Sequence, residues 1–234
     1  MLQKWELMER RYAKITPSVM KWARTTAHYS IDEAAKRIKR KPEEISGWET
    51  DDLLPTIAQL RNAAKVYKRP LAVFYLPEPP KDFQTLRDFR VTNYGGPDSY
   101  SPEFAFLLRE TQERQITISE IMQENEEDQI EFIGTASIQT PIEDLARIIR
   151  TRLDLPDEII KFDTRALALK YWYDKIEKLG VFVFETGNMK GRKIEPEEVR
   201  GFVISDDYAP FIFINAQDTK AGQIFTLFHE LVHL

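Results

Sequence analysis

Apolar residues recur at helical spacing along most of this chain, and the N-terminal part predicts a set of short helices. Between residues 17 and 75 these helices begin near Pro17, Ile31, Pro42 and Ile57. Ser30 and Glu33 have the spacing of a capping box at the start of the second helix. A tight polar turn joins the second and third helices, so this pair is interpreted as a helix-turn-helix.

A second helical region is expected after residue 100. Ser101 precedes a long helical pattern whose later part is acidic, which indicates a solvated face. Thr140 and Glu143 have the spacing of another capping box, and a further helix is predicted from about Thr164 to Leu179.

Residues 77–100 are rich in proline and contain a glycine pair, which is typical of a linker. The predicted organisation is therefore a helical domain over 1–76, a linker over 77–100 and a second domain over 101–234. Within the linker, Leu86–Arg90 is interpreted as a surface anchor that packs Phe89 on the second domain.

The hydrophobic period changes after residue 180. Three short runs of β-branched and aromatic residues predict strands: Val181–Glu185, Gly201–Ser205 and Phe211–Asn215. Asp206–Pro210 predicts a hairpin turn between the last two strands. An apolar helix capped by Asp218 should follow. The expected fold class is α+β, with an N-terminal all-α domain and a small sheet over the last helix.

That last helix carries an H-E-x-x-H pattern. His229 and His233 are four residues apart, so they share one helix face and can hold one metal ion. Glu230 lies beside that face, where it can act as general base toward an activated water, the arrangement of zinc peptidases. The alternative is a buried helix that carries two histidines by chance.

A catalytic zinc site has three protein ligands, and the sequence offers two histidines. His28, the remaining histidine, lies in a different region, so the third ligand should be a carboxylate. The sequence stops one residue after His233, and the helix is apolar nearly all round. We therefore expect either a fragment of a longer protein or a chain end that is covered by something else.

Composition narrows the function classes. The absence of cysteine excludes disulfides and thiolate metal sites, and no apolar run approaches the ~20 residues of a membrane helix. The N-terminus lacks the apolar segment of a signal peptide, so we expect a soluble cytoplasmic protein. Net charge is -5, but residues 1–70 carry +6, which leaves -11 for the rest and indicates a basic module joined to an acidic one.

The basic module has candidate DNA contacts. Basic side chains precede or open the third helix and two polar ones follow on it: Arg37, Lys39, Arg40, Lys41, Ser46 and Thr50. Glu43 and Glu44 oppose this interpretation, because their carboxylates would repel phosphate where a recognition helix faces the groove. DNA binding and a scaffold or protein-binding role both stay open.

The segments Ser30–Ile38, Ile45–Glu49 and Pro55–Arg61 resemble the XRE (Cro-like) helix-turn-helix. With Tyr67–Pro80 after them and His229–His233 on an apolar helix, the chain resembles the ImmA/IrrE family of metallopeptidases with an N-terminal XRE domain. The resemblance implies a zincin-like fold, a Zn2+ cofactor (another divalent ion is possible) and cleavage of a repressor-like protein. It also implies a third ligand on a helix beyond the present sequence.

In a zincin-like fold an edge strand binds the substrate segment, and Phe211–Asn215 is one candidate edge; an interior position is the alternative. Two other functions stay open. One is a DNA-binding regulator or antitoxin-like protein with an inactive or incomplete peptidase module. The other is a split protein that a second polypeptide completes.

Overall fold

The computed structural model describes residues 12–80, 100–156, 158–185 and 193–234. Contacts divide these residues into two units, one formed by residues 12–80 and 100–106 and the other by residues 107–234. Most of the predicted linker, residues 81–99, lies outside the described residues, and so does the expected anchor at Phe89. No helix among the described residues is long and apolar enough to cross a membrane.

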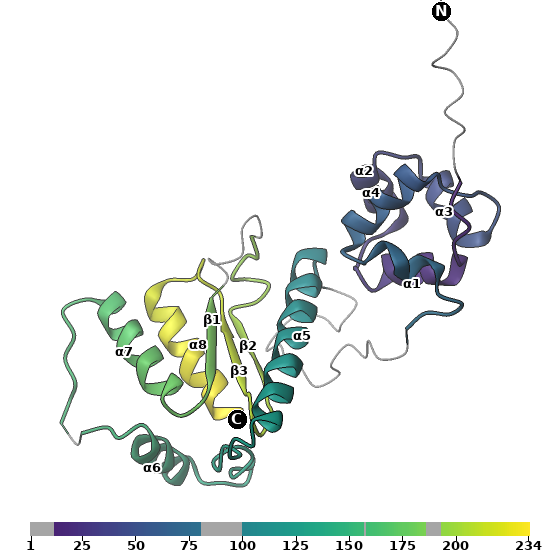
Figure 1. The fold of residues 1–234 in the computed structure, drawn as a ribbon. Coiled ribbons are helices and arrows are strands. Elements are labelled where there is room, and N and C mark those ends of the chain that lie inside the picture. The colour runs from purple at the N-terminus through teal and green to yellow at the C-terminus, as the bar shows by residue number, and fades with distance from the viewer. Residues whose placement is uncertain (1–11, 81–99, 157, 186–192) are drawn as a thin grey trace, which may run out of the picture. The chain divides into compact units, whose positions relative to one another are not determined.

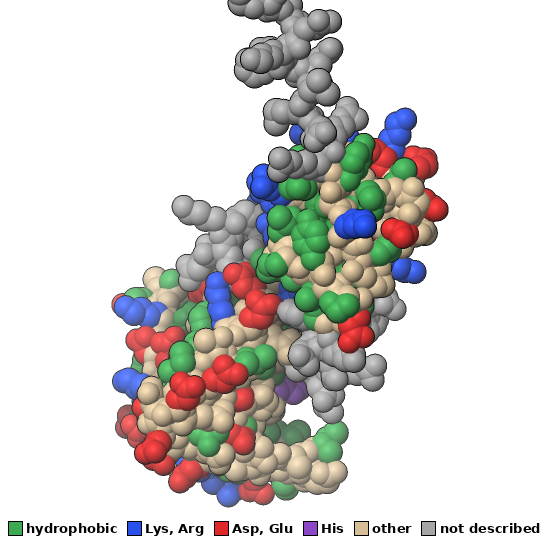
Figure 2. Space-filling view, turned by 45° about the vertical axis from the view of Figure 1, so that its right-hand side comes forward, with side chains coloured by type: hydrophobic (Ala, Val, Ile, Leu, Met, Phe, Trp, Pro, Cys, Tyr) green, Lys and Arg blue, Asp and Glu red, His purple; other side chains and the backbone are tan. Residues whose placement is uncertain are grey.

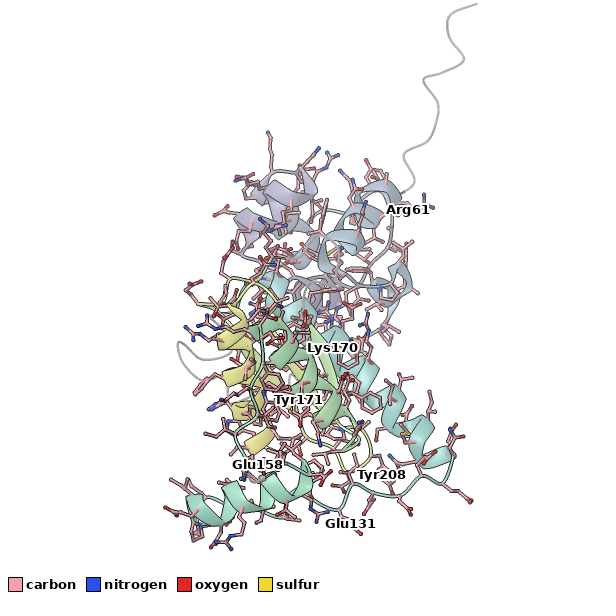
Figure 3. All side chains as sticks on the ribbon, turned by 90° about the vertical axis from the view of Figure 1, so that its left-hand side faces the viewer. Arg61, Glu131, Glu158, Lys170, Tyr171 and Tyr208 are labelled. Atoms are coloured by element: carbon pink, nitrogen blue, oxygen red, sulfur yellow. The ribbon has the colours of Figure 1, made fainter. Side chains whose placement is uncertain are left out.

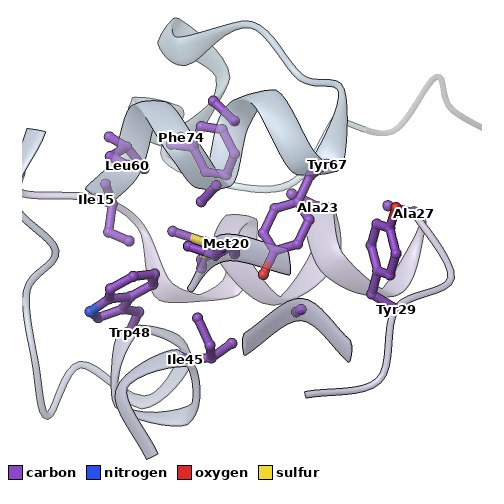
Figure 4. Close-up of a cluster of buried hydrophobic side chains, with 14 of the residues drawn as sticks. Ile15, Met20, Ala23, Ala27, Tyr29, Ile45, Trp48, Leu60, Tyr67 and Phe74 are labelled. Carbon is purple, nitrogen blue, oxygen red and sulfur yellow. The ribbon is translucent and has the colours of Figure 1, made fainter. Parts of the chain in front are cut away.

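The first unit is a bundle of short helices (Figure 1). Its elements follow the predicted boundaries closely, and the structure adds a short 3-10 helix: α1 Pro17–Thr25, α2 Ile31–Ile38, α3 Pro42–Thr50, α4 Ile57–Tyr67 and η1 Leu71–Tyr75. Met20, Trp48 and Tyr67 lie in its core together with Phe74, all at most 2% exposed (Figure 4). The assignment of α2 and α3 to an XRE-type helix-turn-helix stays a prediction.

Side chains cap two of these helices, one of them at the capping box predicted for Ser30. The Ser30 hydroxyl accepts a hydrogen bond from the Glu33 backbone N–H at 3.2 Å, and the Glu33 carboxylate accepts one from the Ser30 N–H at 2.9 Å. Thr56 and Gln59 form the same reciprocal pair at the start of α4. Each pair satisfies two backbone donors that a helix start leaves free, which explains why the boundaries fall where the sequence places them.

The second unit joins helices to a three-stranded sheet. The helix α5 (Pro102–Glu124) starts in the first unit and continues into the second. The remaining elements are α6 Ile142–Arg152, α7 Arg165–Glu177, β1 Phe182–Glu185, β2 Gly201–Ile204, β3 Phe211–Ile214 and α8 Lys220–Val232. Strand order is β1-β3-β2, with β1 parallel and β2 antiparallel to β3.

Alternation along β3 divides the core of this unit between the two faces of the sheet. Ile212 and Ile214 pack with Leu227 and Leu231 of α8, and α7 and α8 lie on one side of the sheet in Figure 1. Phe211 and Phe213 belong to the other face, where they contact aromatic rings of β1 and β2: Phe182, Phe184 and Phe202. The predicted strands are therefore present, and they place α8 directly under β2 and β3.

Trp172 extends the core on the helical side of the sheet. Its ring lies 5.0 Å from that of Phe228 in α8 and 4.9 Å from that of Tyr171 in α7. Figure 3 shows Tyr171 on the ribbon of α7, next to Lys170. The aromatic contacts fix α8 against α7, so the helix with the H-E-x-x-H pattern is held from two directions.

One predicted helix cap is wrong, and for the last strand the structure shows the interior position that was the alternative to an edge. Thr140 does not cap α6, because Pro141 occupies the N-cap position and the Thr140 hydroxyl accepts a hydrogen bond from the Ser137 N–H instead. The last strand before α8 is not an edge: β3 is the central strand, buried along its whole length. Hairpin pairing with β2 and parallel pairing with β1 together place it there, and the order of strands cannot be read from one strand's sequence.

Candidate functional site

The helix α8 begins one residue later than the sequence predicts. Thr219, not Asp218, is the N-cap: its hydroxyl accepts a hydrogen bond from the Gly222 N–H at 3.1 Å. The Asp218 carboxylate accepts one from the Thr219 N–H at 2.7 Å and so supports the cap from outside. The helix ends at Val232, and His233 follows with a helical backbone conformation, so the four-residue spacing still holds.

The apolar residues of α8 are not all buried against the described part of the chain. Leu227 and Leu231 are at most 5% exposed, but Phe225 is 69% and Val232 45% exposed. The helix therefore has one face in the core and one apolar face at the surface. His229 and His233 lie between these faces and are half-buried.

The two histidines converge on one point. Nε2 of His229 lies 3.2 Å from Nε2 of His233, and the ring planes are nearly perpendicular, at 84°. Two nitrogens that bind the same tetrahedral zinc ion at about 2.0–2.1 Å lie about 3.3 Å apart. The imidazole pair therefore fits a shared metal ion. No group of three or more potential ligands forms among the described residues, so a third protein ligand is not found there.

Glu230 lies next to this pair, on the side of α8 that faces the sheet. Glu230 is 4% exposed, and burial raises the pKa of its carboxyl to about 7. Burial alone accounts for this shift, because no cation within the described residues compensates the charge. A carboxyl with a pKa near neutral both accepts and returns a proton readily at physiological pH.

Gly201 brings the strand β2 against this part of α8. A Cβ atom at Gly201 would lie 2.5 Å from Cγ2 of Thr226 and 3.6 Å from Cγ of Glu230. Only glycine permits such an approach without displacing the strand. The close packing therefore sets the distance between β2 and Glu230. This role of Gly201 was not predicted from the sequence, although a glycine at the start of a strand pattern is a usable signal for close approach.

A cleft of about 910 Å3 opens beside Glu230 and His233. One wall is formed by β2 from Phe202 onward and by Ser205 after it, and the other by the segment that leads from Gly134 into α6. Figure 2 shows a histidine side chain beside an opening in the surface. The cleft therefore brings together the general-base candidate, one metal-ligand candidate and a strand.

The strand on the cleft is an edge of the sheet. Within the described residues β2 pairs with β3 alone. The Asn215 N–H donates to the Arg200 carbonyl at 2.8 Å, which makes Arg200 and Asn215 a hydrogen-bonded pair. Such pairs alternate along antiparallel strands, so the N–H and C=O groups of Gly201 and Val203 point away from β3. The free edge of the sheet beside the cleft is thus β2, and not the candidate edge Phe211–Asn215.

The candidate DNA contacts lie in the first unit, and several of them have partners there. Arg37 forms an ion pair with Glu103 at 2.9 Å, and the Thr50 hydroxyl hydrogen-bonds to Asp52 at 2.6 Å. The others lie at the α2–α3 turn or on α3: Lys39, Arg40 and Lys41 are exposed, and Ser46 is half-buried. His28 also belongs to this unit.

The C-terminal part of the chain has a recognisable family signature. Residues 176–234 match the family model of the IrrE N-terminal-like domain, peptidase M78. The matched region contains the three strands and α8 with both histidines and Glu230. No curated protein and no solved structure matches the chain significantly. The match supports the ImmA/IrrE resemblance for this region and suggests a metallopeptidase.

Proposed function

We propose that this chain is a metalloendopeptidase in which His229 and His233 hold a divalent metal ion, with zinc as the first candidate. The observation that carries the proposal is the convergence of the two Nε2 atoms, 3.2 Å apart, beside a buried glutamate in an open cleft. The family match over residues 176–234 supports the same chemistry.

Glu230 acts as the general base in this proposal. A zinc ion at the histidines would supply a Lewis acid, which polarises a peptide carbonyl and makes water a better nucleophile. Glu230 takes the proton from the water and returns it to the leaving amine. Its raised pKa suits both steps, because its protonated and ionised forms are then close in free energy.

The substrate segment pairs with β2 in an extended conformation. The outward N–H and C=O groups of Gly201 and Val203 offer hydrogen bonds to a peptide backbone, as in other cases of strand addition. A peptide bound there lies beside Glu230 because Gly201 packs β2 onto α8. The proposed substrate is therefore an unfolded or exposed segment of a protein.

We extend the proposal to a regulatory role, with a repressor-like protein as substrate. The basic helical unit at the N-terminus, with exposed Lys39, Arg40 and Lys41, would recruit the peptidase to double-stranded DNA or to a protein bound there. Salt-dependent binding to duplex DNA would support this part of the proposal. This recruiting role of the N-terminal unit is independent of the peptidase chemistry.

Zinc binding by the whole chain tests the metal site. We expect His229→Ala to abolish zinc binding measured by calorimetry and elemental analysis, since one of the two converging nitrogens is lost. His28→Asn is the matched control, because it removes the other unit's histidine and asparagine tolerates the positive φ of 55° found there. Equal zinc content in the parent and in His229→Ala would refute the site.

A further inference from the structure

The wall of the cleft that faces β2 carries exposed aliphatic side chains among polar, uncharged ones (Ser137, Gln139 and Thr140). Ile138 and Ile142 line it and are 89% and 80% exposed. Leu145 of α6 and Val232 at the end of α8 continue the same surface. Large aliphatic side chains with this exposure leave apolar area in water that a bound ligand would cover.

The cleft has almost no charge. Among the side chains that line it, Glu230 and His233 alone are ionisable, and both are assigned to the reaction centre. A charged substrate side chain would lose hydration in the cleft without gaining an opposite charge in return. A large apolar side chain has no charge to desolvate, and it would cover Ile138 and Ile142.

The free edge of β2 determines how a peptide would present its side chains. A peptide paired with Gly201 and Val203 is extended, so successive side chains point in opposite directions. Every second side chain can then reach the wall formed by Ile138 and Ile142. The wall of the cleft can therefore contact a substrate side chain next to the backbone that pairs with β2.

We propose that the cleft selects extended segments with a large aliphatic or aromatic side chain next to the scissile bond, and that Ile138 and Ile142 determine this specificity. This inference rests on the proposed peptidase function. It goes beyond that function by naming the class of substrate sequence and the residues that choose it.

Peptide binding tests the proposal without turnover. The probe is a set of fluorescein-labelled decapeptides with blocked ends, identical except for leucine, alanine, lysine or aspartate at the centre. Binding to the whole chain carrying Glu230→Gln is measured by fluorescence anisotropy. We expect the leucine peptide to bind at least about tenfold more tightly than the other three, as burial of one leucine side chain implies.

Variants of the wall then assign the preference. Ile138→Asp and Ile142→Asp should each weaken binding of the leucine peptide and reduce its advantage over the lysine peptide. Ile159→Asp is the matched control, because Ile159 is 87% exposed but does not line the cleft. All three positions are at the surface, so the fold should tolerate the changes.

Several outcomes would overturn the inference: no binding of any peptide, equal binding of all four, or equal losses in the wall variants and in Ile159→Asp. Hydrolysis of the same peptides by the parent chain separates this inference from the proposed function. Preferential binding without hydrolysis by the metal-loaded parent would count against peptidase activity of this chain and would keep the apolar cleft. Hydrolysis of all four peptides at equal rates would support the peptidase and refute the specificity assigned to Ile138 and Ile142.

Discussion

Glu49 in the first unit and Glu230 in the second are both glutamates removed from water on a helix, but their surroundings differ in kind. The Glu49 side chain is 6% exposed and receives two hydrogen bonds from the Arg24 guanidinium, at 2.7 and 2.9 Å. Glu230 is 4% exposed and has no such cation among the described residues. One carboxylate is paired, and the other has a pKa raised to about 7.

The difference separates a structural carboxylate from a chemical one. The buried ion pair between Arg24 and Glu49 links two helices, α1 and α3. A buried carboxyl without a partner costs stability, and its ionisation responds to whatever approaches it. We interpret Glu230 as a group kept unpaired for a ligand and a proton, which is typical of active sites.

Removing the unpaired carboxylate should have the largest effect on activity and little effect on stability. We expect Glu230→Gln to lower the rate of peptide cleavage by at least about 1,000-fold, since general-base catalysis contributes about 100- to 10,000-fold. Its thermal unfolding midpoint should be unchanged or higher. Glu195→Gln, at an exposed position, is the control. A Glu230→Gln chain that cleaves as fast as the parent would contradict the assignment.

Breaking the paired carboxylate should do the opposite. Arg24→Met leaves Glu49 buried without its cation, and we expect the free energy of unfolding in urea to fall by about 3 kcal/mol. Arg24→Met combined with Glu49→Leu should recover most of that loss. Arg114→Met, which removes an exposed pair with Glu110, should cost only about 0.5 kcal/mol. Equal losses in Arg24→Met and Arg114→Met would mean that burial of the pair is unimportant.

Asp206 is a third kind of carboxylate and should show the smallest effect. Burial opposes its charge, but hydrogen bonds from the Ala209 and Tyr208 N–H groups and the Ser119 hydroxyl lower its pKa overall. We expect Asp206→Asn to cost about 1–2 kcal/mol of unfolding free energy at pH 6.

The pH dependence of this loss has a definite sign. Because the folded-state pKa of Asp206 is lowered, its carboxylate stabilises the fold above the unfolded-state pKa of about 3.9, and this contribution disappears as the pH falls through the folded-state value. The difference between parent and Asp206→Asn should therefore shrink below about pH 4. A difference that grows in acid would show that the mutation acts through packing instead.

Local sequence signals determined much of the framework. The capping pair at Ser30 and the helix start at Thr164 depend on hydrogen bonds between residues three apart, so the sequence predicts them directly. The H-E-x-x-H spacing likewise places His229 and His233 on one face of α8, and the structure brings their nitrogens within 3.2 Å. Thr140 fails as a cap because Pro141 takes that position.

The tertiary structure decided the rest of the site. The sequence does not say that β2 is the edge strand, that Gly201 packs it onto Glu230, or that Ile138 and Ile142 face it across a cleft. These relations join residues that are tens of positions apart, so they depend on strand order and on the packing of whole elements. Capping hydrogen bonds and helix periodicity involve residues at most four positions apart, so the local sequence determines them. Burial and cleft geometry depend on how segments distant in the sequence pack into one core, so only the tertiary structure determines them.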